Sequence, residues 1–217
     1  MGGASLTPVE RQTALLTPIS VQRSKPLADT ASARVEIGAR SQLDPLRQGH
    51  LDGLCGLYAI VNGLRLACAG TATIPLRQSK ELFALGLAFL ARKGRLQKAI
   101  VEGLHRRRRQ ALAHYLADAA SCAGRQFTVE RADKAEMSSV DDIFDWITES
   151  LQQNKPVLIP LMGALNHLTV ISGISDKRLF LFDSGGLHFV QRAGCGLKSG
   201  YHQVQVKGLM RIAATAS

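Results

Sequence analysis

The hydrophobic periodicity of this 217-residue chain changes once, at Pro156. Before Pro156, apolar residues recur every three to four positions, the period of a helix with one buried face. After it come short β-rich runs separated by Gly, Asn, Asp and Lys, such as VLIPLM, HLTVISGI, RLFLF, LHFVQ and YHQVQV. Helices therefore come first and antiparallel strands last, which predicts one α+β domain.

The helical half divides into several elements. A stripe at positions 57, 60, 61, 64 and 68 predicts a helix that begins near residue 54 and ends before Gly70. Further helices are expected over 78–91, 96–120 and 139–153, and a short strand over 126–131. Hydrophobic residues make up 46% of the chain and charged residues 20%, a mixture that excludes disorder throughout and a coiled coil.

The first forty residues differ from the rest. Residues 1–40 contain three prolines among Ser, Thr, Ala and Arg and have no sustained period, so we expect a flexible N-terminal arm before a domain over 41–217. The first twenty residues lack the apolar stretch of a signal peptide, and no apolar run spans a bilayer. We expect the protein to be cytoplasmic, or exported without a classical signal peptide.

The four cysteines are far apart and have no zinc-ligand spacing. Four cysteines in a chain of this length do not resemble a disulfide scaffold, so the sequence favours a reducing compartment. Cys68, Cys122 and Cys195 are expected to be structural. Neither a metal nor a cofactor is implied.

The fourth cysteine, Cys55, lies where the first helix is predicted to begin. Unpaired backbone N–H groups and the helix dipole stabilise a thiolate at such a position. Gly53 and Gly56 flank it, which we expect to let a substrate backbone approach closely. Without further evidence, a cysteine beside glycine in an apolar segment is more often a buried structural thiol.

A second candidate group lies on a predicted hairpin. A turn centred on Ser175 pairs residues whose numbers sum to 350, and this register places His167 opposite Asp183. Their Cβ atoms would then be about 4.5–5.5 Å apart on one sheet face. An aspartate at that distance can fix the tautomer and orientation of an imidazole.

A helix-start Cys, a strand-borne His and an acid sixteen residues later form an ordered set. In this order the chain resembles the papain-like cysteine peptidase superfamily over roughly residues 45–206. The segment from Trp146 through Lys155-Pro156-Val-Leu-Ile-Pro-Leu to His167 looks most like the C39-like bacteriocin-leader peptidases. The Cys-His-Asp order and spacing also resemble the YopT-type effector proteases.

The resemblance implies the role of each residue. Cys55 would be the nucleophile, His167 the general base and acid, and Asp183 the residue that orients the imidazole. Gln48, seven residues before Cys55 where the family usually has six, would hold the oxyanion with the backbone N–H of Cys55. The expected activity is that of a cysteine peptidase cleaving peptide bonds through an acyl-enzyme.

Two other functions stay open. The same triad serves a protein glutamine deamidase, a transamidase or an acyltransferase, because all of these form an acyl-enzyme. A catalytically inactive relative would instead act as a binding module.

The net charge of +10 is concentrated in one segment. It carries eight cations against the single acid Glu102, namely Arg92, Lys93, Arg95, Lys98, Arg106, Arg107, Arg108 and Arg109. On one helix these would form a positive collar, either simply solvated or a docking surface for an acidic protein or an anionic membrane. Nucleic acid is the weakest candidate, because no aromatic residues interleave with the arginines.

Overall fold

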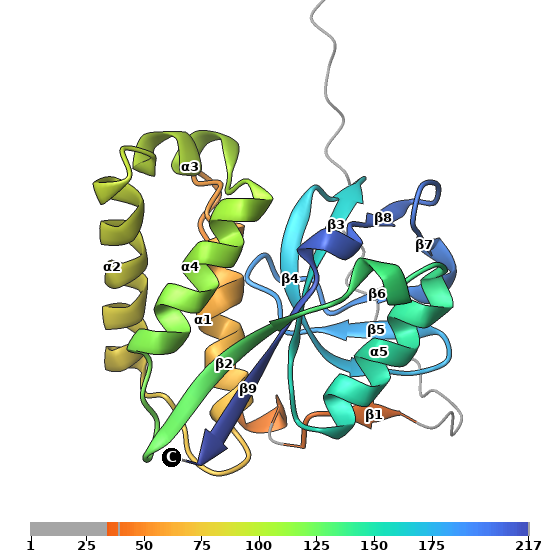
Figure 1. The fold of residues 1–217 in the computed structure, drawn as a ribbon, viewed down its shortest axis with the longest axis horizontal. Helices are drawn as coiled ribbons and strands as arrows, with labels where there is room; N and C mark the ends of the chain where they lie inside the picture. The colour runs from red at the N-terminus through yellow and green to blue at the C-terminus, as the bar shows by residue number, and fades with distance from the viewer. Residues whose placement is uncertain (1–33, 39, 217) are drawn as a thin grey trace, which may run out of the picture. The chain divides into compact units, whose positions relative to one another are not determined.

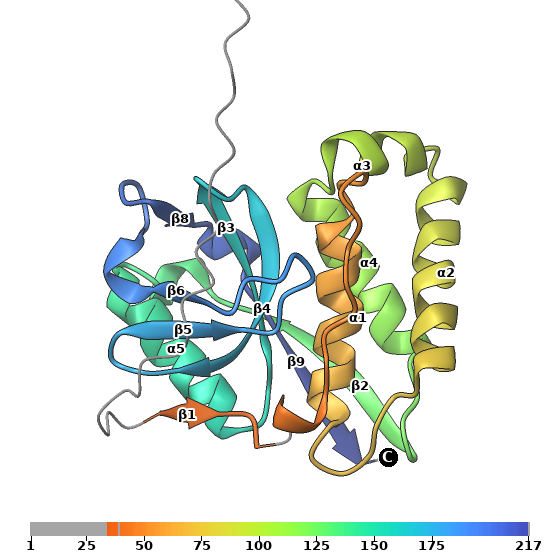
Figure 2. The ribbon, with the colours of Figure 1, turned by 180° about the vertical axis from the view of Figure 1, so that it is seen from behind.

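The computed structural model describes residues 34–38 and 40–216, which form a mixed α+β fold. A sheet lies between α5 on one face and the remaining helices on the other (Figure 1; Figure 2). The helices of the described part are α1 (Cys55–Cys68), α2 (Leu76–Arg92), α3 (Leu96–Glu102), α4 (Arg106–Ala119) and α5 (Val140–Gln152). Its strands are β1 (Val35–Glu36), β2 (Arg125–Arg131), β3 (Val157–Gly163), β4 (His167–Ile174), β5 (Arg178–Leu181), β6 (Phe189–Gln191), β7 (Cys195–Gly196), β8 (His202–Val204) and β9 (Met210–Ala216).

The predicted change of period at Pro156 is confirmed, since α5 ends at Gln152 and β3 begins at Val157. The sheet order is β2-β9-β3-β4-β5-β6, with β1 added to β4 and β8 to β3. All of these pairs are antiparallel, and only the short β7–β8 pair is parallel. The last strand, β9, was not expected from the sequence, because its alanines give a weak alternating pattern.

Both faces of the sheet are covered. Along β9 the side chain of Ile212 faces Gly63 of α1, whereas its neighbour Arg211 reaches α5 and bonds Ser150 at 3.3 Å. Successive strand residues point to opposite faces, so one strand contacts helices on both sides. This explains why β3 and β4 are almost continuously apolar and buried, as strands covered on both faces must be.

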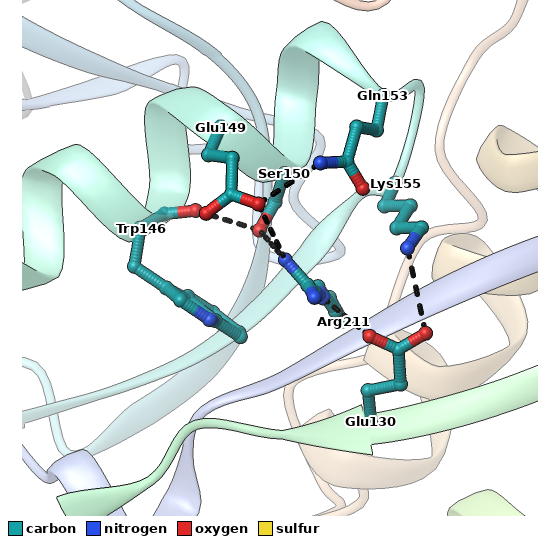
Figure 3. A network of polar contacts seen from close by, with 7 residues as sticks. All are labelled: Glu130, Trp146, Glu149, Ser150, Gln153, Lys155 and Arg211. Atoms are coloured by element: carbon teal, nitrogen blue, oxygen red, sulfur yellow. Dashed lines mark hydrogen bonds and ion pairs between the residues drawn. The ribbon is translucent and has the colours of Figure 1, made fainter. Parts of the chain in front are cut away.

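A polar network attaches α5 to the sheet (Figure 3). The Arg211 guanidinium donates to Glu130 of β2 at 2.7 Å and lies over the Trp146 ring at 5.2 Å. Lys155 approaches the same carboxylate at 3.4 Å. Although partial burial opposes its charge, the bond from Arg211 and the nearby Lys155 hold the pKa of Glu130 below its ordinary value. The network therefore fixes the C-terminal end of α5 against β2 and β9.

The expected helix over 96–120 is two helices. Gly103 separates α3 from α4 with φ 80° and ψ −175°, a conformation that a side chain would strain. The chain turns there, and Leu104 inserts into the core at 8% exposure before α4 begins at Arg106. The expectation was wrong because the apolar stripe continues across the break, whereas the helical backbone conformation is interrupted there.

The boundary drawn at residue 40 falls inside the fold. Val35 and Glu36 form β1 on the edge of β4, and Ile37 is 2% exposed within the core. A two-residue strand is too short to carry an alternating signal, so the sequence did not indicate it. The remainder of the expected arm, residues 1–33, lies outside the described residues.

The cysteines correct a further expectation. Cys68, the last residue of α1, forms a disulfide with Cys122 before β2, which closes a loop with a sequence separation of 54. The expectation that the cysteines form no disulfide was therefore wrong for Cys68 and Cys122. Their sequence spacing says nothing of their distance in space, which the packing of α1 beside the start of β2 determines. Cys195 is a free, buried thiol, and burial raises its pKa to about 11.

No helix among the described residues has the length and hydropathy that a membrane span requires.

Candidate active site

The packing of α1 along β4 brings the predicted nucleophile and base together. Cys55 is the first residue of α1, and His167 is the first residue of β4. The two elements run side by side through the core, so their first residues meet at one end of the interface. Cys55 is half-buried there, and its interaction with the His167 side chain contributes to lowering the pKa of the thiol.

His167 also contacts the predicted acid. Its Nε2 lies 2.6 Å from Oδ1 of Asp183, which leaves Nδ1 as the ring nitrogen that faces Cys55. Asp183 is 1% exposed, and its other oxygen, Oδ2, accepts the backbone N–H groups of Gly185 at 2.8 Å and Leu187 at 3.1 Å. Both carboxylate oxygens therefore have fixed partners, and the imidazole is held in one orientation.

The hairpin register that predicted this contact was wrong, although the contact exists. The strands pair Ile174 with Leu179 and, beyond an irregularity, Ile171 with Leu181, so the sums are 353 and 352 instead of 350. Extended to its end, this register would not place Asp183 opposite His167. Asp183 lies after β5 has ended, in a turn that carries its carboxylate back toward the start of β4.

The electrostatics favour a charged pair. Burial opposes the ionised thiol, but the His167 hydrogen bond, a backbone hydrogen bond with Leu168 and the charge of Arg109 hold the pKa of Cys55 below its ordinary value. Burial likewise opposes the imidazolium, yet the bonds to Asp183 and Cys55 raise the pKa of His167 to about 10. Burial also opposes the charge of Asp183, but the hydrogen bond and positive charge of His167 hold the pKa of Asp183 below its ordinary value. The arrangement therefore supports a thiolate beside an imidazolium.

The loop before Cys55 is held by its own polar groups. Oδ1 of Asp52 accepts the backbone N–H of Leu54 at 2.9 Å and the side-chain amide of Gln48 at 3.0 Å. The Gln48 backbone N–H donates to the carbonyl of Ser184 at 3.0 Å. Gln48 thus connects the loop that carries the nucleophile to the turn that carries Asp183.

This position bears on the oxyanion role expected of Gln48. Its side-chain nitrogen is engaged by the carbonyl and carboxylate of Asp52, and Gln48 is not among the residues that line the cavity around Cys55. To reach an oxyanion, the amide would have to leave Asp52. The role of Gln48 stays a prediction. At the first turn of α1 the N–H groups of Leu57 and Tyr58 donate to the Leu54 carbonyl, which leaves those of Cys55 and Gly56 for an oxyanion.

The glycines on either side of Cys55 allow close internal packing, and the substrate approach expected of them stays a prediction. A Cβ at Gly53 would lie 2.8 Å from the backbone nitrogen of Gly103, and the Gly53 N–H donates to the carbonyl of Ile100 at 2.6 Å. A Cβ at Gly56 would lie 3.1 Å from Leu104. Both glycines allow the bend between α3 and α4 to pack directly against the start of α1.

A cavity of about 710 Å³ contains Cys55 and His167. The bend at Gly103 forms its wall on the helical side. On the sheet side the wall comes from the end of β3, the start of β4 and the segment after β8. The remaining lining residues are Glu102, Leu104, His105, Arg106, Arg109, Lys134, Met137, Met162, Asn166, Leu168, Leu197, Lys198, Val204, Gln205, Val206 and Lys207.

Arg109 is the site residue that the sequence interpretation misplaced. It was assigned to an exterior collar, but it is 9% exposed and lines the cavity with Cys55. The signal that could have found it is helical spacing. Arg109 lies three and seven residues before the buried Leu112 and Leu116, on the apolar face of α4.

The other members of the collar are spread over three helices. Arg92 ends α2 and donates to the Tyr115 hydroxyl at 3.0 Å, and Lys98 of α3 pairs with Glu102 at 3.3 Å. Lys93, Arg95, Lys98, Arg107 and Arg108 line a second cavity, which shares the bend at residues 102–105 with the first. The expectation of one continuous collar was wrong because the helix is broken at Gly103.

Within the part of the chain that the structure describes, no group of three or more His, Cys, Asp or Glu residues is arranged to hold a metal ion. Comparisons with models of known protein families, with curated proteins and with solved structures find no match to this chain.

Proposed function

We propose that this protein is a cysteine hydrolase that cleaves peptide bonds through an acyl-enzyme. The observation that carries the proposal is the position of His167, which is hydrogen-bonded to buried Asp183 at 2.6 Å and lines one cavity with Cys55. A nucleophile, a base within hydrogen-bond reach and a group that orients the base are the parts that covalent acyl transfer needs.

The reaction follows from the protonation states. The Cys55 thiolate attacks the carbonyl carbon, and backbone N–H groups at the start of α1 stabilise the resulting oxyanion. The His167 imidazolium then gives its proton to the leaving amine as the C–N bond breaks, which leaves a thioester. Neutral His167 next removes a proton from water, the hydroxide adds to the thioester, and the acid product departs as the thiolate reforms. Asp183 stabilises the imidazolium throughout.

The arrangement also supports the papain-like resemblance. The nucleophile begins a helix at the centre of a helical half, and the base and acid come from the antiparallel sheet that follows. We propose that this part of the chain, residues 45–206, is a papain-like domain related to the C39-like and YopT-type peptidases. Those peptidases act on polypeptides, as the proposed function requires.

The deamidase, transamidase and acyltransferase alternatives use the same acyl-enzyme. The extent of the cavity favours a polypeptide, because its lining comes from both the helical half and the sheet and is not confined to one narrow pit. The Cys68–Cys122 disulfide favours the exported setting over the cytoplasmic one, since disulfides persist in oxidising surroundings.

The test is the pH dependence of Cys55 alkylation by iodoacetamide, followed by mass spectrometry in the wild type and in His167→Ala. Cys195 is the internal reference, because its pKa is raised to about 11. We expect Cys55 to react well below the ordinary thiol pKa of about 8.5 and His167→Ala to abolish that reactivity. Peptide libraries are then screened for cleavage, with Cys55→Ser as the inactive control.

The opposite result is equally informative. If Cys55 reacts no faster than Cys195 and His167→Ala changes nothing, the catalytic proposal fails. The binding-module alternative then predicts that Cys55→Ser leaves function intact, while charge reversal at Arg107 and Arg108 removes it.

A further inference from the structure

A buried arginine lies next to the proposed nucleophile. The Arg109 side chain crosses from α4 past Gly56, where a Cβ would lie 3.3 Å from its Cδ, toward Gly208, where a Cβ would lie 3.5 Å from Nη2. Both neighbours lack a side chain, which leaves the space that the guanidinium occupies. Because Gly56 directly follows Cys55, the Arg109 stem passes next to the start of α1, and the guanidinium lines the same cavity as Cys55.

Arg109 lacks the partners that other arginines of the fold have. Arg65 donates to the carbonyl of Asp44 at 2.7 Å, and Arg211 pairs with Glu130. The Nε of Arg109 is buried without a hydrogen bond, and none of the ion pairs found over residues 34–38 and 40–216 involves Arg109. A buried N–H group without a hydrogen bond is unfavourable, and burial of the side chain lowers the pKa of Arg109. The Cys55 thiolate offsets part of that cost by charge alone.

The cavity around Arg109 is positively charged as a whole. Its other cationic lining residues are Arg106, Lys134, Lys198 and Lys207. The single acidic residue in the lining, Glu102, already pairs with Lys98. The apolar part of the lining includes Met137, Met162 and Leu197. An occupant with an apolar stem and a negatively charged end complements such a surface.

We propose that Arg109 binds a carboxylate of the substrate, the side chain of an Asp or Glu that adjoins the scissile bond, and that the substrates are therefore acidic polypeptides. The inference rests on the proposed function, since it assigns a specificity residue to that same site. The shared cavity sets the position of the acidic residue: because Arg109 and Cys55 line one cavity and the Arg109 stem passes Gly56, the guanidinium reaches substrate residues close to the attacked carbonyl. A carboxylate accepts the planar, forked donors of arginine in a bidentate geometry.

The experiment compares two alkylating agents that differ in charge. Iodoacetate carries a carboxylate on the carbon that reacts, whereas iodoacetamide is neutral and of almost the same size. The ratio of their rates at Cys55 is measured by mass spectrometry and divided by the same ratio for Cys55 in the urea-unfolded protein. The variants are Arg109→Gln, Arg109→Lys and, as the matched control, Arg107→Gln, which removes an exposed arginine of the same helix.

We expect the folded wild type to favour iodoacetate by about tenfold or more, the size of a charge-assisted hydrogen bond. Arg109→Gln should return the ratio to about one, Arg109→Lys should keep part of the preference because lysine lacks the forked donors, and Arg107→Gln should leave it unchanged. A wild-type ratio near one refutes the proposal without any variant, and a preference that Arg109→Gln removes while Arg107→Gln keeps it assigns the preference to Arg109.

The outcomes separate this inference from the proposed function. If Cys55 reacts rapidly but without preference for iodoacetate, the carboxylate site is refuted while the proposed function stands. If Arg109→Gln slows both reagents equally, Arg109 acts only on the thiolate, and the specificity role is again refuted. If Cys55 reacts rapidly with neither reagent, the proposed function fails and the substrate assignment fails with it.

Discussion

The turn that holds Asp183 makes the outcome of one substitution specific. In Asp183→Asn, one amide oxygen replaces the two carboxylate oxygens. The backbone N–H groups of Gly185 and Leu187 both point at the position of Oδ2, so the Asn oxygen must turn toward them. The Asn NH₂ group then faces Nε2 of His167. To accept a hydrogen bond from it, Nε2 must be without a hydrogen of its own. This contact disfavours the imidazolium relative to the neutral form with its hydrogen on Nδ1.

The magnitude follows from the lost bond. Asp183 is buried and lies 2.6 Å from His167, so the full charge-assisted hydrogen bond applies, about 1.5–3 kcal/mol. One pKa unit is about 1.36 kcal/mol, so the pKa of His167 should fall by roughly one to two units. Since the imidazolium supports the thiolate, the onset of Cys55 ionisation should move up by a similar amount. At a pH below the pKa of Cys55 in both proteins, the alkylation rate should therefore drop about 10- to 100-fold.

The assay is the pH profile of Cys55 alkylation by iodoacetamide for the wild type and Asp183→Asn, with Asp118→Asn as the control. Asp118 is an exposed carboxylate of α4. Urea unfolding of each variant shows whether the protein remains folded at the pH values compared. An unchanged profile in a folded Asp183→Asn would show that the carboxylate does not stabilise the imidazolium, and the argument from the turn would be refuted.

Three further predictions concern the site and its support. Peptide hydrolysis should rise with pH through the lowered pKa of Cys55 and fall as pH rises through about 10, because His167 then loses the proton that the leaving amine needs. The dependence of kcat/KM on pH measures both changes, and a plateau above pH 10 would contradict this role of His167. Removing the disulfide with Cys68→Ser and Cys122→Ser should lower the free energy of unfolding by about 2–4 kcal/mol, because a loop with a sequence separation of 54 is no longer closed in the unfolded chain. Urea denaturation measures this change, and equal midpoints with and without reductant would argue against the bond. Gly53→Ala should destabilise the fold by about 1–3 kcal/mol and slow Cys55 alkylation, because its Cβ meets the backbone of the α3–α4 bend, whereas Gly70→Ala, with open space around it, should do neither.

The elements of the fold follow closely from the sequence where the apolar spacing is regular. The stripe at positions 57 to 68 gave α1, and the helix expected over 139–153 is α5, whose start Ser139 and Asp142 cap. Regular spacing fails where the backbone changes direction without a change of pattern, as at Gly103. It also fails for β1 and β9, where two residues or a run of alanines carry too little signal.

The candidate site was predicted in its residues more than in its geometry. Cys55, His167 and Asp183 meet, but the register that suggested the pair was wrong, because a β-irregularity and the early end of β5 changed which residues are opposite. Gln48 lies close to this group and bonds Asp52, a contact four residues away that no spacing rule distinguishes from an oxyanion role.

Residue types and local periodicity thus determined, from the sequence by itself, that a helical half precedes an antiparallel sheet. They also indicated a thiol at the start of a helix and an imidazole and a carboxylate on the strands that follow. These are local properties, because side-chain chemistry and helix or strand period are set by near neighbours. The tertiary structure alone decided that Cys68 bonds Cys122 and that Arg109 turns inward beside Cys55. Both depend on how α1, α4 and β2 pack together, and residues far apart in sequence carry no local record of their distance in space.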